Sequence, residues 1–419
     1  MTKLQDVFNI YKDYVMPTYT KQPLVFVKGK GSFLWDIQGN KYLDFFPGWG
    51  VCNLGHCHPK VMSAVKDQVT KLIFVPNNYY NLPQAKLARE LNHWTKYPFK
   101  AFFCNSGAEA NEAAIKFSRK FGKGKYEVIT FENSFHGRTL AALAATGQAK
   151  YQQGFAPLPE GFKTVKFNDF SALKCALTPK TAAIMLELVQ GEGGINIATR
   201  GFILNLRQLC DDENILLIID EVQTGIGRTG KMFAWQNYGI VPDIFTMAKA
   251  LGGGLPIGAM MVKKEISDCL SPGTHASTFG GGPLVAKAAV AVLRSIQKEK
   301  ILRNTLKMSE YLQAKLLELK DKYPLIKEIR GMGLMWGLEL KQEGREIVEQ
   351  CLKQGLLINC THDTVLRLMP ALNIGKTEIN KAIKILDNVL RGADPAPSKK
   401  LNDLKATGFR IMNRKEGAG

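Results

Sequence analysis

Lys249 stands in a stretch that could make an amine reactive. It lies in PDIFTMAKALGGGLPIG (242–258), where an apolar run meets a run of glycines. Apolar surroundings disfavour the charged form of an amine and lower its pKa towards the nucleophilic free base. Lys249 could therefore form a Schiff base with a carbonyl compound. A lone lysine in an apolar run more often extends its ammonium group to water, so the rest of the chain must decide.

An acidic residue closes an apolar run shortly before Lys249. The segment ILLII (215–219) is apolar throughout, and Asp220 follows it. If the segment is a strand, the carboxylate lies at the mouth of the sheet, where it could keep a pyridine nitrogen protonated. Pyridoxal phosphate needs that arrangement to act as an electron sink. The alternative is an acid that only caps the next turn.

Two further turns carry residue types that suit a phosphate and a carboxylate. In CNSGAEANEAA, Ser106, Gly107 and Ala108 stand between an apolar segment and a helical pattern, so free N–H groups and the helix dipole would favour a phosphate. In FENSFHGRT, the aromatic ring of Phe135 is followed three residues later by the guanidinium of Arg138. A ring can stack on a flat cofactor and a guanidinium can grip a carboxylate. Core packing and surface charge are the alternatives for each.

Strands and helices that alternate along the chain must position these residues. From residue 100 onwards, apolar runs, glycine-containing turns and helical patterns follow one another. This alternation predicts an α/β fold with a mainly parallel sheet covered by helices on both faces. Ligands of such sheets bind beyond the carboxyl ends of the strands. Before this region we expect a hairpin that turns at 39–40 and helices over 58–71 and 83–95, and after it a long helix from about 281 and a last helix over 376–390.

The composition is that of a folded, reduced protein. The 419 residues include 45% hydrophobic and 22% charged residues, which excludes wholesale disorder and predicts two or more domains. We find no apolar run that could cross a membrane and no signal peptide, and the eight cysteines form no CxxC pair. These features predict a cytoplasmic protein.

Neither a metal site nor a nucleic-acid groove is expected. His56, Cys57 and His58 are adjacent, but a second ligand cluster is lacking and a turn before Pro59 explains the run equally well. The net charge of +19 is spread along the chain without a dense basic block with interleaved aromatic residues. A non-catalytic binder of anions or nucleic acid is supported by the charge alone.

Several longer motifs together resemble one family. DEVQTGIGRTGKMFA, TMAKALGGGLPIGA and THASTFGGGPLVA, with SGAEA and FHGRT upstream, resemble the class III pyridoxal-phosphate aminotransferases over roughly residues 20–391. The resemblance implies fold type I, with a mainly parallel seven-stranded sheet in a large domain and a smaller α/β domain. The implied division is 1–55 packing with the small domain, 56–280 as the large domain, 281–391 as the small domain, and 392–419 as a basic tail.

The resemblance also implies a role for each matching residue. Lys249 would bind the cofactor covalently and move the proton, and Asp220 would bind the pyridine nitrogen. Thr278 would reach the phosphate of a partner subunit, which makes a homodimer the expected unit. The remaining cofactor-binding residues would be Ser106, Gly107 and Ala108 at the phosphate, Phe135 and Val222 on the ring faces, Gln223 near the phenolic oxygen, and His136.

The substrate side of the resemblance implies transfer of a terminal amino group from N-acetylornithine to 2-oxoglutarate, in arginine biosynthesis. Arg367 would bind the α-carboxylate of glutamate, Glu192 would pair with Arg367 when the other substrate is bound, and Arg138 would hold the far carboxylate. Ser277 would lie beside the substrate. Trp49 stands at the pocket edge, where relatives have a smaller aliphatic residue or a tyrosine. Succinylornithine, succinyl-diaminopimelate, ornithine and 4-aminobutyrate therefore stay open as donors.

Overall fold

A mainly parallel sheet of seven strands forms the centre of the protein. The computed structural model describes residues 4–393. In spatial order the strands are β4 (Phe99–Cys104), β12 (Gly258–Lys263), β11 (Ile244–Met247), β10 (Leu216–Asp220), β7 (Thr181–Leu186), β5 (Glu127–Phe131) and β6 (Phe162–Val165). β12 runs antiparallel to both its neighbours, and the other pairs are parallel. The predicted fold class is confirmed.

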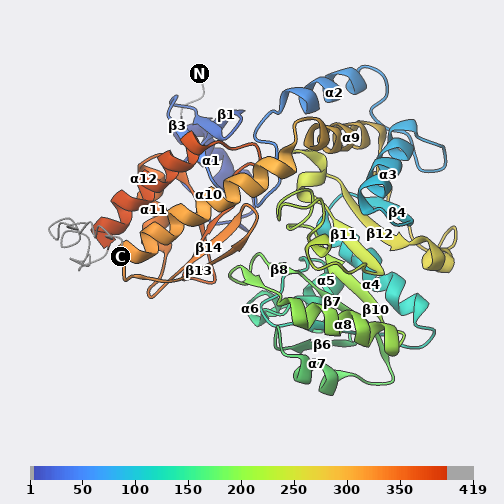
Figure 1. The fold of residues 1–419 in the computed structure, drawn as a ribbon. Coiled ribbons are helices and arrows are strands. Elements are labelled where there is room, and N and C mark those ends of the chain that lie inside the picture. Colours follow the sequence, from blue (N-terminus) through green and yellow to red (C-terminus); the bar gives the residue numbers. More distant parts are fainter. Residues whose placement is uncertain (1–3, 394–419) are drawn as a thin grey trace, which may run out of the picture.

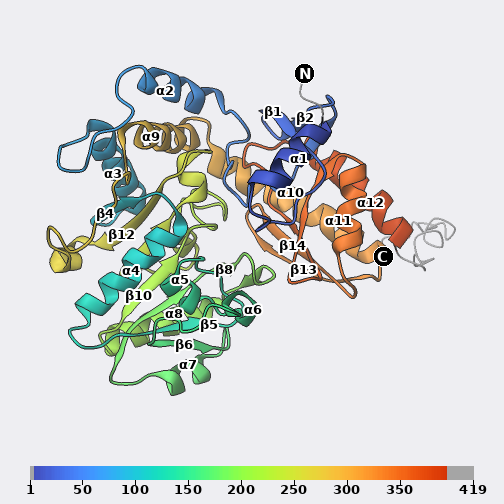
Figure 2. The same ribbon diagram turned by 180° about the vertical axis from the view of Figure 1, so that it is seen from behind.

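Helices cover both faces of this sheet, as the apolar runs require. Every residue of β7 and of β10 is buried. Along β7, Ala183 and Met185 pack in one apolar cluster with α4 (Gly107–Phe121), whereas Ile184 and Leu186 pack in another with α8 (Arg200–Asp212). This alternation follows from the two-residue period of a strand. α8 lies in front of the sheet in Figure 1 and α4 in Figure 2.

The C-terminal part of the chain forms a second body, shown in orange and red in Figure 1. It contains an antiparallel sheet in the order β13 (Ile326–Met332), β14 (Met335–Leu340), β17 (Val365–Leu368) and β16 (Asn359–Thr361). Its helices are α10 (Ile301–Lys322), α11 (Arg345–Lys353) and α12 (Lys376–Ala393).

The N-terminal segment joins this second body. β1 (Phe26–Lys30), β2 (Phe33–Asp36) and β3 (Lys41–Asp44) form a sheet with β15 (Leu356–Leu357), which pairs in parallel with β3. α1 (Leu4–Tyr14) precedes these strands. The predicted hairpin is the β2–β3 pair, and its turn is held by the Asp36 carboxylate, which accepts from the N–H groups of Gln38 and Asn40.

The other helices connect or flank these two bodies. The predicted helices before residue 100 are α2 (Pro59–Val69) and α3 (Leu82–Thr95), and both pack on α9 (Pro283–Lys298). The shorter helices are α5 (Leu140–Ala145), α6 (Ala149–Gln152) and α7 (Phe170–Ala176), with 3-10 turns at Ala234–Asn237, Lys249–Gly252 and Lys264–Cys269. None of the described helices is long and apolar enough to cross a membrane. The predicted tail lies outside the described residues, except for its first two.

Candidate active site

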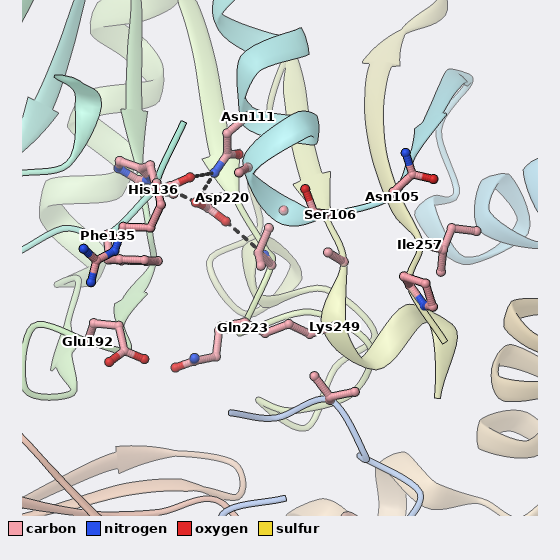
Figure 3. Close-up of a pocket in the computed structure, with 18 of the residues that line it drawn as sticks. Asn105, Ser106, Asn111, Phe135, His136, Glu192, Asp220, Gln223, Lys249 and Ile257 are labelled. Atoms are coloured by element: carbon pink, nitrogen blue, oxygen red, sulfur yellow. Dashed lines mark hydrogen bonds and ion pairs between the residues drawn. The ribbon is translucent and has the colours of Figure 1, made fainter. Parts of the chain in front are cut away.

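The turns at the carboxyl ends of the strands meet around a cavity of about 470 Å³ (Figure 3). Its size lies within the range of ordinary small-molecule sites. Eleven of the fifteen predicted site residues line it: Ser106, Gly107, Ala108, Phe135, His136, Arg138, Glu192, Asp220, Val222, Gln223 and Lys249. The topology therefore brings together residues that are more than a hundred positions apart in sequence.

The N-terminus of α4 forms one wall of the cavity. The Ser106 hydroxyl caps the helix by accepting from the Glu109 N–H at 3.2 Å, and Gly107 is the first helical residue. The N–H groups of a first helical turn have no partner within the helix and attract anions. A side chain at 107 would not fit, because its Cβ would lie 2.7 Å from Cγ1 of Val222.

Asp220 is buried and held by three donors. Its Oδ2 accepts from Asn111 Nδ2 and from His136 Nδ1, each at 2.8 Å, and its Oδ1 accepts from the Val222 N–H at 3.0 Å. Asn111 is itself fixed, because its Oδ1 accepts from the Thr246 hydroxyl at 2.7 Å. Figure 3 shows Asn111 and His136 converging on Asp220.

Lys249 lies just after β11, the strand that pairs with β10, whose last residue is Asp220. β11 ends at Met247, and Lys249 adopts a left-handed backbone conformation with φ of 42°. Burial lowers the pKa of its amine, and the positive charge of Arg367 lowers it further. The carboxylates of Glu192, Asp220 and Glu187 act in the opposite direction but do not reverse the shift. The amine is therefore nearer to its free-base form than an exposed lysine, as its apolar surroundings predict.

Glu192 and Arg367 form a buried ion pair at the cavity. Glu192 lines the cavity, and its Oε1 lies 2.8 Å from Arg367 Nη1. Arg367 is fully buried on β17 and also donates to the Gly191 carbonyl at 2.6 Å and to Asn359 Oδ1 at 3.0 Å. Burial alone would raise the pKa of Glu192, but the charge and hydrogen bonds of Arg367 hold it below its usual value.

Two residues of the site were missed by the sequence reasoning. Asn111 lies one helical turn after Gly107 on α4, a spacing that puts both on the same face of the helix. Glu187 follows β7, and its carboxylate accepts from the N–H groups of Phe135 at 2.8 Å and Gly191 at 3.1 Å. Burial raises the pKa of Glu187 to about 7. Its place at the carboxyl end of a central strand was the available signal.

Trp49, Ser277, Thr278 and Arg367 do not line this cavity. The Trp49 side chain is 50% exposed and packs edge-on against Phe46, while its carbonyl accepts from Gln223 Nε2 at 3.3 Å. Ser277 accepts from Asn105 Nδ2 at 3.2 Å and borders a neighbouring depression, and Thr278 is exposed.

His56 and His58, which are two positions apart in the sequence, contact different carboxylates. His56 Nε2 lies 2.7 Å from Asp44 Oδ2, and His58 Nε2 lies 3.2 Å from Glu299 Oε2. Residues 4–393 contain no group of three or more histidine, cysteine or acidic side chains that could hold a metal ion.

The donors around the cavity fit pyridoxal phosphate. The first turn of α4 suits the phosphate, the buried carboxylate of Asp220 suits a protonated ring nitrogen, and Lys249 supplies an amine of lowered pKa. Phe135 and Val222 offer apolar surfaces for a flat ring. The arrangement can therefore bind an anionic aromatic aldehyde and move a proton beside it.

Comparison with known proteins agrees with this chemistry. The family model of class-III aminotransferases matches residues 14–390. An acetylornithine aminotransferase of Methanocaldococcus jannaschii is 53% identical over 91% of this chain and 97% of its own length. One of Caldanaerobacter subterraneus is 50% identical over 90% of this chain and 98% of its own.

Solved structures extend the likeness to the fold. The ornithine aminotransferase of Toxoplasma gondii matches with a TM-score of 0.90 at 34% identity, over 94% of this chain and 96% of that one. The acetylornithine aminotransferase of Elizabethkingia anophelis matches with a TM-score of 0.84 at 30% identity, over 94% of this chain and 100% of that one. With the cavity and its lysine, aspartate and arginine, these matches establish that the chain belongs to the class-III aminotransferases.

Proposed function

We propose that this enzyme transfers the terminal amino group of N-acetylornithine to 2-oxoglutarate, as a step of arginine biosynthesis. The observation that carries the proposal is the Glu192–Arg367 ion pair at the cavity, at 2.8 Å. An enzyme that accepts both glutamate and a terminal amine in one pocket needs an arginine that can be neutralised in alternation. The two relatives at 53% and 50% identity, both named acetylornithine aminotransferases, support the choice of donor.

Pyridoxal phosphate is the cofactor of this family. When bound, it supplies a carrier for the amino group and an acceptor for the negative charge that develops on the substrate carbon. One Toxoplasma gondii ornithine aminotransferase structure, at 34% identity, describes partial occupancy of this cofactor at the active site. In the present chain the phosphate would be held at Gly107 and Ala108, the ring nitrogen by Asp220, and the aldehyde carbon by Lys249.

Each charged side chain then has one task in the reaction. Lys249, with its lowered pKa, takes the proton from the substrate carbon and returns it on the other side of the transfer. Asp220, held in place by Asn111 and His136, would accept the hydrogen bond of the protonated ring nitrogen. Together these two residues determine how readily the proton moves.

The two arginines bind the substrates. Arg138 lines the cavity and holds the carboxylate that lies away from the reacting carbon. Arg367 holds the α-carboxylate of glutamate once Glu192 has moved aside. With N-acetylornithine bound, Glu192 returns to the guanidinium, because an unpaired buried charge is costly.

Ornithine is the second candidate donor. It is favoured by the TM-score of 0.90 with the Toxoplasma gondii ornithine aminotransferase. That structure is 34% identical to this chain, whereas the M. jannaschii acetylornithine aminotransferase is 53% identical. N-acetylornithine is therefore the better supported donor, and Trp49 is the side chain to change first if ornithine reacts.

We also propose a cytoplasmic homodimer. The eight free cysteines support a reducing compartment. The exposure of Thr278 outside its own cavity supports a role in a partner's site. The proposed packing of residues 1–55 with the small domain is supported by the pairing of β3 with β15, which ties the N-terminal segment to the C-terminal body.

Separate half-reactions test the donor. Purified protein with its yellow cofactor is mixed with N-acetylornithine, ornithine, succinylornithine or 4-aminobutyrate, without any keto acid, and the loss of visible absorbance is followed. We expect fast bleaching by N-acetylornithine. Lys249→Ala is the control, and it should lack both the lysine-bound absorbance and turnover. Fast bleaching by a different donor alone would overturn the assignment of N-acetylornithine, and normal turnover by the variant would overturn the role of Lys249.

A further inference from the structure

Arg138 has no acidic partner in the described part of the chain. Among residues 4–393 no ion pair or hydrogen bond holds its guanidinium, and its side chain is exposed at the cavity. A long, free side chain would lose much conformational entropy on binding a carboxylate. The affinity of the site therefore depends on what holds Arg138 in place before the substrate arrives.

The nearest group that orients Arg138 is an aromatic ring. Its Cζ lies 4.0 Å from the ring centroid of Tyr151 and 5.7 Å from that of Phe135. The two rings meet edge to face at 5.7 Å, with an interplanar angle of 84°. A guanidinium over a ring face is attracted to it while its N–H groups at the edge stay free for a carboxylate. Lys150 Nζ is farther from the Tyr151 ring, at 5.2 Å.

Tyr151 is itself held against the loop that carries Phe135. It belongs to α6, whose capping residue Gln148 donates from Nε2 to the carbonyls of Asn133 and Ser134, at 3.3 and 3.2 Å. Gln152, the residue that follows Tyr151 in the sequence, donates from Nε2 to the carbonyls of Leu143 and Thr146, at 3.1 and 2.9 Å. The ring therefore stands at a fixed place relative to the cavity wall.

We infer that Tyr151 is a positioning residue that presents Arg138 to the far carboxylate of both substrates. The inference rests on the proposed function, since it names how the carboxylate end of the same site is recognised. Tyr151 does not line the cavity, and among the predicted cofactor residues it meets Phe135 alone, at the ring edge. Its loss should weaken the binding of carboxylates and leave the proton transfer at Lys249 unchanged.

Equilibrium binding of glutarate, a five-carbon dicarboxylate without a reacting carbonyl, measures this role without turnover. Calorimetry is done on the holoenzyme and on Tyr151→Leu, which keeps apolar bulk, and Tyr151→Phe, which keeps the ring face. We expect the dissociation constant to rise about three- to tenfold in Tyr151→Leu and by less than about twofold in Tyr151→Phe. Tyr311→Leu, which removes a ring 4.7 Å from Lys376 Nζ outside the cavity, is the matched control.

Steady-state kinetics separate positioning from general damage. In Tyr151→Leu the KM values of N-acetylornithine and 2-oxoglutarate should rise while kcat stays within about twofold. N-acetylputrescine is the same donor without its carboxylate, so its kcat/KM should be the same in Tyr151→Leu as in the wild-type enzyme.

Three results with the variants would overturn the inference. They are unchanged glutarate binding in Tyr151→Leu, equal weakening in both Tyr151 variants, and an equal loss of activity with N-acetylputrescine. A wild-type enzyme that binds no glutarate would overturn it as well. If the wild type rejects N-acetylornithine but the glutarate affinities follow the expected order, the proposed donor fails and the role of Tyr151 stands.

Discussion

On the proposed function, Glu192 is the residue on which the use of two different substrates depends. Its carboxylate neutralises a guanidinium that is fully buried and otherwise bound only to neutral oxygens, those of Gly191, Asn359 and Gln223. On the proposed function, binding of N-acetylornithine would leave this pair intact, whereas glutamate would replace Glu192 by a substrate carboxylate. The two half-reactions should therefore respond in opposite ways to a neutral residue at 192.

Glu192→Gln should make the enzyme prefer glutamate. The variant leaves Arg367 without its partner, which costs about 2 kcal/mol or more and lowers kcat/KM for N-acetylornithine more than tenfold. The kcat/KM for glutamate should stay equal or rise, because no carboxylate of the protein then competes with glutamate for Arg367. Stopped-flow absorbance of each half-reaction measures the two values, with Glu328→Gln, at an exposed ion pair with Arg330, as the control. Equal losses with both substrates would contradict the alternation.

Single residues were predictable where type and position both pointed to chemistry. Lys249 and Asp220 follow apolar runs in the sequence, and the ends of buried strands place them at the cavity, whereas Glu192, which also lines it, was expected only from the family resemblance. Asn111 was not predictable in the same way, because an asparagine within a helix is ordinarily a surface residue. Its contact with Asp220 at 2.8 Å depends on how α4 packs across β10 and β11, which is a tertiary property.

The start of α4 is the element that shapes the phosphate end of the site. Its first residue packs directly on Val222, which also lines the cavity. Gly107→Ala would put a Cβ 2.7 Å from Val222 Cγ1, and the stiff β-branched side chain must then shift into the space of the cofactor ring. We expect the dissociation constant of pyridoxal phosphate to rise about tenfold or more.

Gly201→Ala is the matched control for this change. Gly201 stands in the first turn of α8, and a Cβ there meets nothing within 4 Å. Both affinities are measured by titrating the apoenzyme with the cofactor and following absorbance. Equal affinities of the two variants would show that the contact with Val222 does not shape the site.

The end of β3 fixes the loop that leads to the cavity. Asp44 ends the strand, and its Oδ2 lies 2.7 Å from His56 Nε2 across the loop that contains Trp49 and Val51. Burial alone would lower the pKa of His56, but the hydrogen bonds and charges of Asp44 and Cys52 raise it to about 10. The charged histidine therefore stabilises the fold at neutral pH.

Asp44→Asn should destabilise the protein in a manner that depends on pH. Because the folded pKa of His56 is raised above its unfolded value of 6.5, the stabilisation is complete below pH 6.5 and is lost as the pH rises towards 10. We expect the variant to be less stable by about 3 kcal/mol at pH 6, with a difference that shrinks towards pH 10. Urea unfolding at fixed protein concentration measures it, and Asp67→Asn, at an exposed ion pair, is the control. A difference that does not change with pH would exclude the ion pair as its cause.

Long elements were predictable and short ones were not. The predicted helices over 83–95 and 376–390 are α3 and α12, because their patterns extend over several turns and α3 begins at a capping Asn81. Two-residue strands such as β8 (Val189–Gln190) and β15 (Leu356–Leu357) have no pattern of their own. β15 exists because β3, from the other end of the chain, passes beside it, and β8 exists because it pairs with the nearby β9 (Asn196–Ile197).

At the scale of the whole molecule, the proposed homodimer would bring residues of a second chain to the cavity. The four predicted residues that do not line it include Ser277 and Thr278, which follow a segment, 270–276, that is mostly exposed or half-buried. The sequence predicted the partition into a sheet with two helical layers, because apolar periodicity encodes layers. It predicts a partner only through the family resemblance, since no periodicity distinguishes a surface that meets water from one that meets a second copy.

Mixing two inactive variants tests whether Thr278 serves the partner's site. Lys249→Ala lacks the reactive amine, and Thr278→Asp puts a negative charge where the partner's phosphate should bind. If each site combines Lys249 of one subunit with Thr278 of the other, a mixed dimer contains one intact site. Random reassociation should then restore about a quarter of wild-type activity. Mixing each variant with itself is the control, and a mixture that stays inactive while mass spectrometry detects mixed dimers would place Thr278 in its own subunit's site.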